Sequence, residues 1–209
     1  MKKNILSLIA VLCFSVASPV MAGPLYFGVG YGQTNFDSID LQYDSPAADI
    51  SDDQDVATKV FFGQYLSSNF SYEIAYADLG EYTASSTGNY DVNIKLKALT
   101  ADLMAHQHVH PKWDFFAKLG VAYWKTDLSY NDFTNSGSGD ESKWGPHIGL
   151  GFNYKINDSW MLGVEWEQYQ NVGQDTNVTL PSSALELNGN DLDVLGIRLT
   201  YRLHLAPGP

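Results

Sequence analysis

The sequence predicts an all-β fold, namely an eight-stranded antiparallel up-and-down transmembrane β-barrel. Eight segments of the 209-residue chain alternate apolar and polar residues, the connections between them are alternately long and short, and the N-terminus has the features of an export signal. Successive side chains of a strand point to opposite faces, so each segment has one apolar and one polar face. Short periplasmic turns and long external loops are typical of outer-membrane barrels, and a soluble sandwich has no reason to keep that alternation.

The last alternating segment, residues 195–205, shows the pattern best. In a soluble sandwich its apolar face would pack on a second sheet, whereas in a membrane barrel that face contacts lipid and the polar face lines the interior. Closure into a barrel also leaves no open strand edge in the lipid. The apolar face carries Leu195, Ile197, Leu199, Tyr201, Leu203 and Leu205, and the polar face carries Gly196, Arg198, Thr200, Arg202 and His204.

Residues 1–22 predict a secretory signal peptide. Lys2 and Lys3 form its positive end, the apolar run that follows is too short to span a bilayer comfortably, and compact residues precede the expected cleavage after Ala22. We therefore expect one outer-membrane barrel domain over residues 23–209. The alternative interpretation of this segment is an N-terminal membrane anchor or a core helix.

The exported chain is acidic and has no cysteine. Cys13, the only cysteine, lies in the predicted signal segment, so the fold must be held by its backbone ladder and its packing. The formal net charge is -12, and it becomes -14 when Lys2 and Lys3 are removed. We expect such a chain not to bind nucleic acid.

The eight predicted strands differ in how clearly they show their two faces. In the second strand Val60, Phe61 and Phe62 are consecutive, so its facing is ambiguous. Pro146 cannot donate to a ladder and is expected to mark an irregular strand start. The predicted strands cover residues 25–33, 57–66, 70–77, 92–105, 115–124, 144–156, 160–169 and 195–205. The predicted long loops cover residues 37–55, 80–91, 126–143 and 170–191, and the short turns cover 67–69, 106–112 and 157–159.

Aromatic and charged residues take the places that a membrane barrel requires. Tyr and Trp near the strand ends suit the two membrane interfaces, and examples are Trp113, Trp144, Trp160, Trp166 and Tyr201. The charges predicted to point inward are four acids and four bases, which is the balance that a closed core of ion pairs needs. They are Glu73, Asp102, Lys118, Lys155, Glu165, Glu167, Arg198 and Arg202.

The order and spacing of several short motifs add a family resemblance. Leu99-Thr-Ala-Asp-Leu103, Trp113-Asp-Phe-Phe-Ala-Lys-Leu-Gly120 and Gly163-Val-Glu-Trp166 resemble the barrel domain of outer-membrane protein A and its small relatives. The resemblance covers nearly all of the chain after the signal segment. It implies an eight-stranded barrel with a plugged, polar interior.

The same resemblance implies an internal salt-bridge network, which in that family is credited with gating a small pore. Glu73, Lys118 and Glu165 match that network, with lysine in place of the family's arginine at Lys118. Asp102, Asn153 and Gly163 stand where the family carries a lysine, a glutamate and an arginine. Half of the gate is therefore replaced. Eight strands leave an interior that side chains just fill, which favours a structural plug over a narrow ion path.

Two sets of residues are candidate ligand sites. His106, His108 and His110 would share one side of an extended segment, and imidazoles suit Zn, Cu and Ni; a turn without a metal is the alternative. Lys95 and Lys97, if they point outward at the external rim, would contact lipopolysaccharide phosphates, and a bulge would instead turn them inward.

The first long loop is rich in aspartate and contains no basic residue. Hard cations prefer carboxylates, so the loop is a candidate for calcium-assisted ordering, and a solvated acidic loop is the alternative. The aspartates concerned are Asp37, Asp40, Asp44, Asp49, Asp52, Asp53 and Asp55.

The sequence predicts a structural and surface-interaction role. Loops on a rigid scaffold are where binding usually resides. We expect a monomer that contacts outer-membrane lipids and lipopolysaccharide, and a host or surface ligand through its loops, without a cofactor. A narrow channel is the alternative. We expect no enzyme, because the chain has no Gly-x-Ser-x-Gly motif and no Gly-rich phosphate loop. A lipid A-modifying enzyme would show a His and a Ser close together near the external leaflet.

Overall fold

The computed structural model describes most of the chain beyond the predicted signal segment. Residues 1–22 lie outside the described part, so the signal peptide stays a prediction. The described residues are 23–36, 41–42, 49–50, 54–86, 90–132, 136–172, 176–180, 183–187 and 190–203. No helix in these ranges is long and apolar enough to cross a membrane.

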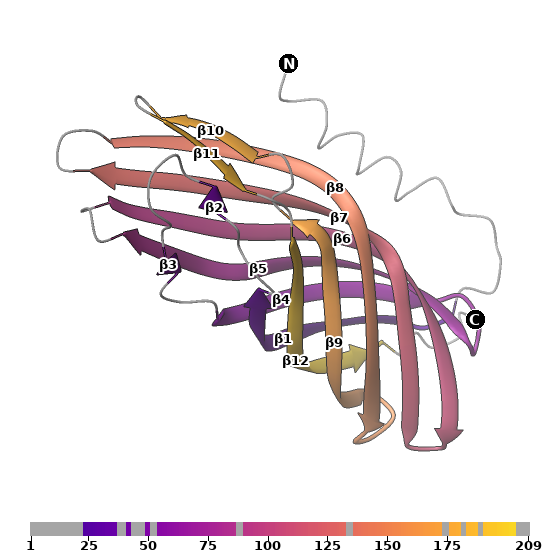
Figure 1. The fold of residues 1–209 in the computed structure, drawn as a ribbon. Helices are drawn as coiled ribbons and strands as arrows, with labels where there is room; N and C mark the ends of the chain where they lie inside the picture. The colour runs from indigo at the N-terminus through magenta and orange to yellow at the C-terminus, as the bar shows by residue number, and fades with distance from the viewer. Residues whose placement is uncertain are drawn as a thin grey trace.

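Eight long antiparallel strands form a closed ring, as the alternation predicts (Figure 1). Each pairs with its neighbours in chain order, and β1 pairs with β12 to close the ring. These strands are β1 (Leu25–Phe36), β4 (Gln54–Tyr65), β5 (Phe70–Ser86), β6 (Tyr90–His110), β7 (Trp113–Asp132), β8 (Ser136–Lys155), β9 (Trp160–Val172) and β12 (Asn190–Arg202). Four short strands are added: β2 (Leu41–Gln42), β3 (Asp49–Ile50), β10 (Thr176–Leu180) and β11 (Ser183–Leu187).

The side chains alternate between the two faces of the wall as expected. In β12, Arg198 is 1% exposed and points inward, whereas its neighbour Ile197 is 54% exposed and points outward. The second predicted strand, β4, places Val60 and Phe62 outward and Phe61 inward, which resolves its ambiguous facing. The apolar outer face is therefore continuous around the ring.

Three of the predicted long loops are mostly strand, and the one over residues 170–191 contains β10 and β11. The β5–β6 ladder continues to Ser86 and Tyr90, and the β7–β8 ladder continues to Asn131 and Ser136. In these two ladders the outward positions are polar and Tyr82 points inward, which is the reverse of the pattern in a lipid-facing strand. Figure 1 shows β5 to β8 running on together past the other strands. We call this end of the barrel the hairpin end and the opposite end, with turns 66–69, 111–112 and 156–159, the short-turn end.

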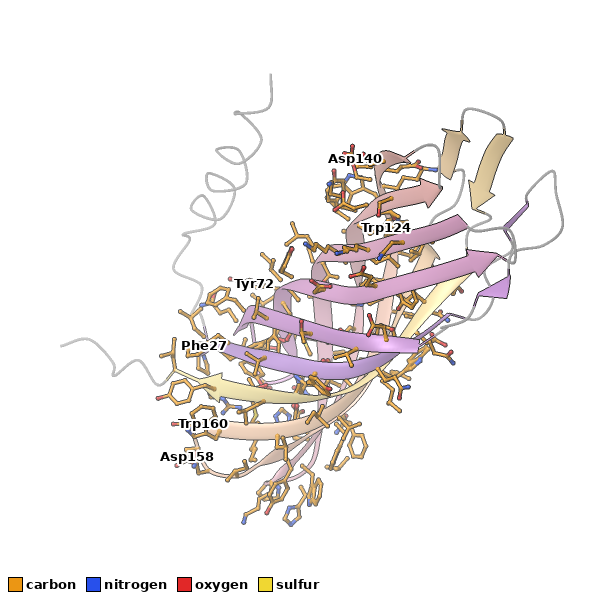
Figure 2. All side chains as sticks on the ribbon, turned by 90° about the vertical axis from the view of Figure 1, so that its left-hand side faces the viewer. Phe27, Tyr72, Trp124, Asp140, Asp158 and Trp160 are labelled. Carbon is orange, nitrogen blue, oxygen red and sulfur yellow. The ribbon has the colours of Figure 1, made fainter. Side chains whose placement is uncertain are left out.

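Figure 2 shows the two ends, with Asp140 at the hairpin end and with Asp158 and Trp160 at the short-turn end. Near each end, two outward aromatic rings lie in contact. Tyr123 and Trp144 lie with ring centroids 5.0 Å apart toward the hairpin end. Trp160 and Tyr201 lie 4.9 Å apart at the short-turn end. Three of the predicted aromatics, Trp144, Trp160 and Tyr201, thus lie near the two ends on the outer face.

Two local irregularities shape the wall. Gly80 has a φ of 101° and lies where the β5–β6 register shifts, a backbone conformation that glycine adopts without strain. Pro146 was predicted to mark a strand start, and this prediction is wrong. The residue lies inside β8, opposite Val121. The β8–β9 ladder reaches only to His147 and Tyr169, immediately beside Pro146, which cannot donate a hydrogen bond.

The interior is layered rather than uniformly polar. Toward the short-turn end Tyr26, Phe61, Tyr65 and Ala75 form a small apolar cluster. Charged side chains fill the middle. A larger apolar cluster lies toward the hairpin end, and it consists of Ala57, Ala77, Leu79, Tyr82, Ile94, Leu96, Ala98, Ala122, Trp124, Tyr169, Val172, Leu192 and Val194.

Candidate functional site: the buried charge network

Six charged side chains from five strands meet in the middle layer of the barrel. We call them the charge network: Lys59 of β4, Glu73 of β5, Lys118 of β7, Glu165 and Glu167 of β9, and Arg198 of β12. All six are buried, with exposed fractions between 0% and 7%. Three cations and three carboxylates therefore neutralise one another inside the wall, as buried charges must.

Lys118 is the centre of the network. Its Nζ atom lies 2.7 Å from Oε1 of Glu73, 2.9 Å from Oε2 of Glu165 and 2.9 Å from Oε1 of Glu167. A lysine ammonium has three donors, and each of them has a carboxylate partner here. The three residues that match the family's gate, Glu73, Lys118 and Glu165, are thus in contact.

Arg198 closes the network from the opposite wall. Its guanidinium donates to Oε2 of Glu73 at 2.6 Å and to Oε2 of Glu165 at 3.0 Å. The same group lies over the ring of Phe61, with 4.2 Å between Cζ and the centroid. Aromatic faces of this kind stabilise a desolvated cation. Its Nε atom has no hydrogen-bond partner in the described residues.

Lys59 is the network member that the sequence did not reveal. It forms ion pairs with Glu165 and with Glu167, at 2.8 Å for the latter. The run Val60-Phe61-Phe62 hid the facing of its strand, so no periodicity rule could assign Lys59 to the interior. The surplus of carboxylates in β9, two residues apart on an inward face, was the available signal for another cation.

Asp102 and His147 extend the network toward the hairpin end. Nδ1 of His147 lies 2.7 Å from Oδ1 of Asp102, and its Nε2 lies 3.7 Å from Oε1 of Glu167. The ring also packs on Tyr169, with centroids 4.5 Å apart. Asp102 was predicted to point inward and does so, but its partner is a histidine rather than a lysine or arginine.

Lys155 and Arg202, the remaining predicted inward charges, are not part of the network. Both are only partly buried, near the short-turn end. Arg202 lies over the ring of Tyr65 at 5.0 Å. No ion pair of either residue occurs within the described ranges. Both are register partners of inward residues, Arg202 of Tyr26 and Lys155 of Met161, which agrees with their predicted facing, but they do not join the ion pairs.

The network leaves little empty space. A cavity of about 20 Å³ lies beside Lys59, Glu165, Glu167 and Tyr169. That volume accommodates about one water molecule. The middle layer thus has the character of a plug, and a hydrated ion would need the network to rearrange.

A second polar chain lies inside the wall near the short-turn end. His106 is hydrogen-bonded through Nδ1 to Oδ2 of Asp114 at 3.0 Å and through Nε2 to Oγ of Ser71 at 2.8 Å. This connectivity is that of a Ser-His-Asp triad. Ser71 and Asp114 have no exposed surface and His106 is 5% exposed, and Tyr26 covers the serine at 3.3 Å. We see no room for a substrate at this serine.

The three histidines do not assemble into a metal site. Residues 106–110 are the end of β6 rather than a turn, so His106 points inward with both ring nitrogens occupied, whereas His110 is exposed. Asp114, a carboxylate that the sequence did not place nearby, binds His106 and lies 3.7 Å from His108. Among the described residues, no group of three His, Cys, Asp or Glu side chains could hold a metal ion.

Asp55 is the member of the acidic first loop whose contacts the structure gives. Its carboxylate accepts hydrogen bonds from the backbone N–H groups of Val56 and Glu81. Asp49 belongs to β3, and the other five aspartates of the loop lie outside the described residues. Asp55 thus holds β4 against β5, and calcium ordering of the loop stays a prediction.

Comparison with known proteins decides the family. The sequence pattern of the outer membrane protein beta-barrel domain matches residues 6–202. The chain belongs to this family. Its strands therefore lie in the outer membrane of a bacterium, with the short-turn end toward the periplasm and the hairpin end outside. No curated protein matches the chain.

Solved structures of small outer-membrane barrels share this barrel's fold. The outer membrane protein OprG of Pseudomonas aeruginosa is 18% identical, with a TM-score of 0.61, and the match covers 88% of this chain and 97% of OprG. AlkL is 16% identical with a TM-score of 0.59, covering 90% of this chain and 93% of AlkL. Ail of Yersinia pestis, in complex with the heparin analogue sucrose octasulfate, is 12% identical with a TM-score of 0.54, covering 87% of this chain and 99% of Ail.

Lys95 and Lys97 of this barrel point outward at the external rim. Nζ of Lys95 lies 3.0 Å from Oε2 of Glu81 on the neighbouring strand. The hydrogen bond from Lys95, together with one from Asn93, holds the pKa of the Glu81 carboxyl below its usual range. Lys97 is partly buried and forms no ion pair within the described ranges. The bulge at Gly80 lies on β5 and does not turn either lysine inward.

Proposed function

We propose that this outer-membrane barrel is closed at its centre and acts through its external surface, as a structural and surface-interaction protein. The charge network carries the proposal: six buried charges fill the middle layer, and the cavity beside them has about 20 Å³. The apolar cluster adds a second filled layer on the external side. A monomer suffices for this role, because the ring has no open edge.

The external surface has more ordered structure than a set of loops. The ladders of β5 to β8 extend outward, so paired strands present the side chains there. Rigid scaffolds suit recognition because little freedom is lost on binding. The Ail complex is a precedent for ligand binding by a barrel of this fold.

Bilayer conductance tests the closed centre. We expect refolded protein in a planar bilayer to give no current above the lipid background. The comparison is a variant with Lys118→Ala and Arg198→Ala, which removes two large side chains from the middle layer. Heat-dependent gel mobility checks that this variant is folded. A steady current through the wild-type protein would refute the proposal in favour of a narrow ion channel.

Shortening one external hairpin tests the surface role. Thr126 of β7 is directly opposite Glu141 of β8, so residues 127–140 can be replaced by Asn-Gly, a pair that suits a two-residue hairpin turn. We expect this variant to fold and insert normally but to lose adhesion of expressing cells to a target surface. Unchanged adhesion after shortening both this hairpin and the β5–β6 hairpin would contradict it.

Absence of enzymatic activity is part of the proposal. The Ser71–His106–Asp114 chain is buried, and Ser71 has no exposed surface to meet an acyl group. We therefore expect no change in the lipid A mass spectrum on overexpression. We also expect no labelling of Ser71 by a fluorophosphonate, and labelling that Ser71→Ala abolishes would refute this part.

A further inference from the structure

The outer wall above the external aromatic band is built as aligned rows of side chains. The register of β5 to β8 sets Tyr76, Leu99, Tyr123 and Trp144 side by side in one row. The next row outward holds Asp78, Lys97, Lys125 and Ser142, and the row beyond holds Glu81, Lys95, Asp127 and Asp140. All of these positions belong to the outward face of their strands.

The first polar row contains two cations directly opposite each other. Lys97 of β6 and Lys125 of β7 are register partners. Side chains at such positions have Cβ atoms roughly 5 Å apart, and like charges there destabilise a strand pair. In a chain with a net charge of -12, two lysines directly opposite each other are an exceptional local arrangement. An anion between the two ammonium groups would remove the repulsion.

The neighbouring acids leave Lys97 without an ion-pair partner in the described ranges. Lys125 binds Asp127 and lies 3.9 Å from Asp140, but both of these carboxylates belong to the row farther from the membrane. Lys97 has no ion-pair partner within the described ranges, although Asp78 is its register neighbour on β5.

The row beneath the lysines fixes their height in the membrane. Trp144 is 68% exposed on the outer face, and its ring lies 5.0 Å from that of Tyr123. Aromatic bands of this kind lie at the level where acyl chains give way to headgroups. Lys97 and Lys125 are one row farther out, which is the level of the lipid phosphates. The lipid of the external leaflet is lipid A, whose glucosamine disaccharide carries phosphate groups.

We propose that Lys97 and Lys125 together bind a phosphate group of lipid A, while Tyr123 and Trp144 contact the adjoining part of its acyl chains. Lysines bind phosphate as point charges, and two of them on a rigid strand pair need little ordering. Lys95 lies one row farther out and is already paired with Glu81. The inference rests on the proposed surface role and names one partner for it.

Native mass spectrometry of the refolded barrel with added lipid A tests this site. Each lysine at a membrane surface contributes a factor of about five, so we expect Lys97→Gln with Lys125→Gln to weaken binding roughly 25-fold. The matched control is Lys112→Gln with Lys155→Gln, which changes the net charge equally; both lysines lie at the periplasmic end. We expect this control to bind like the wild type.

Three outcomes would overturn the assignment. The first is equal loss of binding in both double variants, which would indicate unspecific charge attraction. The second is undiminished wild-type binding of lipid A whose phosphates have been removed. The third is displacement of lipid A by phosphatidylglycerol or inorganic phosphate at the same concentration. None of these outcomes bears on the proposal that the barrel is closed at its centre, because bilayer conductance tests that proposal separately.

Discussion

Lys118 and Glu73 face each other across the barrel interior, with Nζ of the lysine 2.7 Å from Oε1 of the glutamate and no exposed surface on either side chain. They come from β7 and β5, which are not neighbours in the ring. The pair therefore links two strands that are separated by β6. Water cannot replace either partner at this depth, which makes each charge dependent on the other.

Replacing Lys118 by Met should strongly destabilise the barrel. The change leaves Glu73, Glu165 and Glu167 with only Lys59 and Arg198 as cations. Removing one partner of a buried ion pair costs about 3–5 kcal/mol. The urea dependence of unfolding in lipid vesicles, followed by gel mobility, measures the loss.

An exposed lysine and a double variant control this prediction. Lys112→Met changes a solvated side chain and should alter the free energy of unfolding by no more than about 0.5 kcal/mol. Adding Glu73→Gln to Lys118→Met should cost less than the sum of the two single changes, because the unpaired charge is removed. Strict additivity would show that the two residues are not coupled.

His106 should be structurally necessary, although it resembles the middle member of a catalytic triad. His106→Leu leaves the buried Asp114 carboxylate with a 3.4 Å contact to Asn153 and deprives Ser71 of its 2.8 Å partner. A buried polar group without its hydrogen bond costs about 1–3 kcal/mol. The exposed His110→Leu is the matched control, and equal stability of the two variants would disprove a structural role for the His106 chain.

The sequence predicts the barrel well wherever lipid imposes the alternation. The facing of β1, β5, β9 and β12 follows from their apolar positions, because each outward residue contacts hydrocarbon. Outside the membrane that constraint ends, so residues 80–91 and 126–143 resemble loops while they pair as strands. There the apolar residues, such as Tyr82, point inward and the outward residues are polar, so a rule based on lipid-facing residues misses these strands.

The interior partners are harder to predict than the inward faces. Glu73, Lys118 and Glu165 follow from alternation, but their contacts depend on how strands from opposite walls meet. The inward position of Lys59 was not predicted, because the apolar run of three residues after it left the facing of its strand ambiguous. The link between His106 and Asp114 was missed because the strand was predicted to end at residue 105, five residues before the end of β6, and strand ends are poorly fixed by pattern.

Trp124 should stabilise the barrel without sealing it. It lies at 2% exposure in the apolar cluster on the external side of the charge network. Trp124→Ala should cost about 3–5 kcal/mol, as large-to-small changes in well-packed cores do. Because the charge network remains intact, planar-bilayer recordings should still show no current. Conductance in this variant would mean that the apolar cluster, and not the charge network, closes the barrel.

Phe116 fills the space beside Gly151, and a pair of substitutions that enlarges one residue and shortens the other can test this contact. A Cβ atom on Gly151 would lie 2.1 Å from Cζ of Phe116 and 2.7 Å from two further atoms of the same ring. Gly151→Ala should therefore cost about 1–3 kcal/mol through overpacking. Since the obstruction is a single side chain, adding Phe116→Leu should recover part of that loss.

The matched position for this exchange is Gly149, on the same face of β8. Its Cβ would lie 3.1 Å from the carbonyl oxygen of Trp166 and 3.3 Å from Cγ of Glu167, and Phe116 is not among its nearest neighbours. Phe116→Leu should consequently give no relief to Gly149→Ala. Equal relief at both glycines, measured by urea unfolding, would mean that Phe116→Leu loosens the whole interior rather than making room at one contact. If Phe116→Leu restores stability to Gly151→Ala alone, Phe116 and residue 151 are in direct contact. A local steric conflict is removed only by a change at the atoms that cause it.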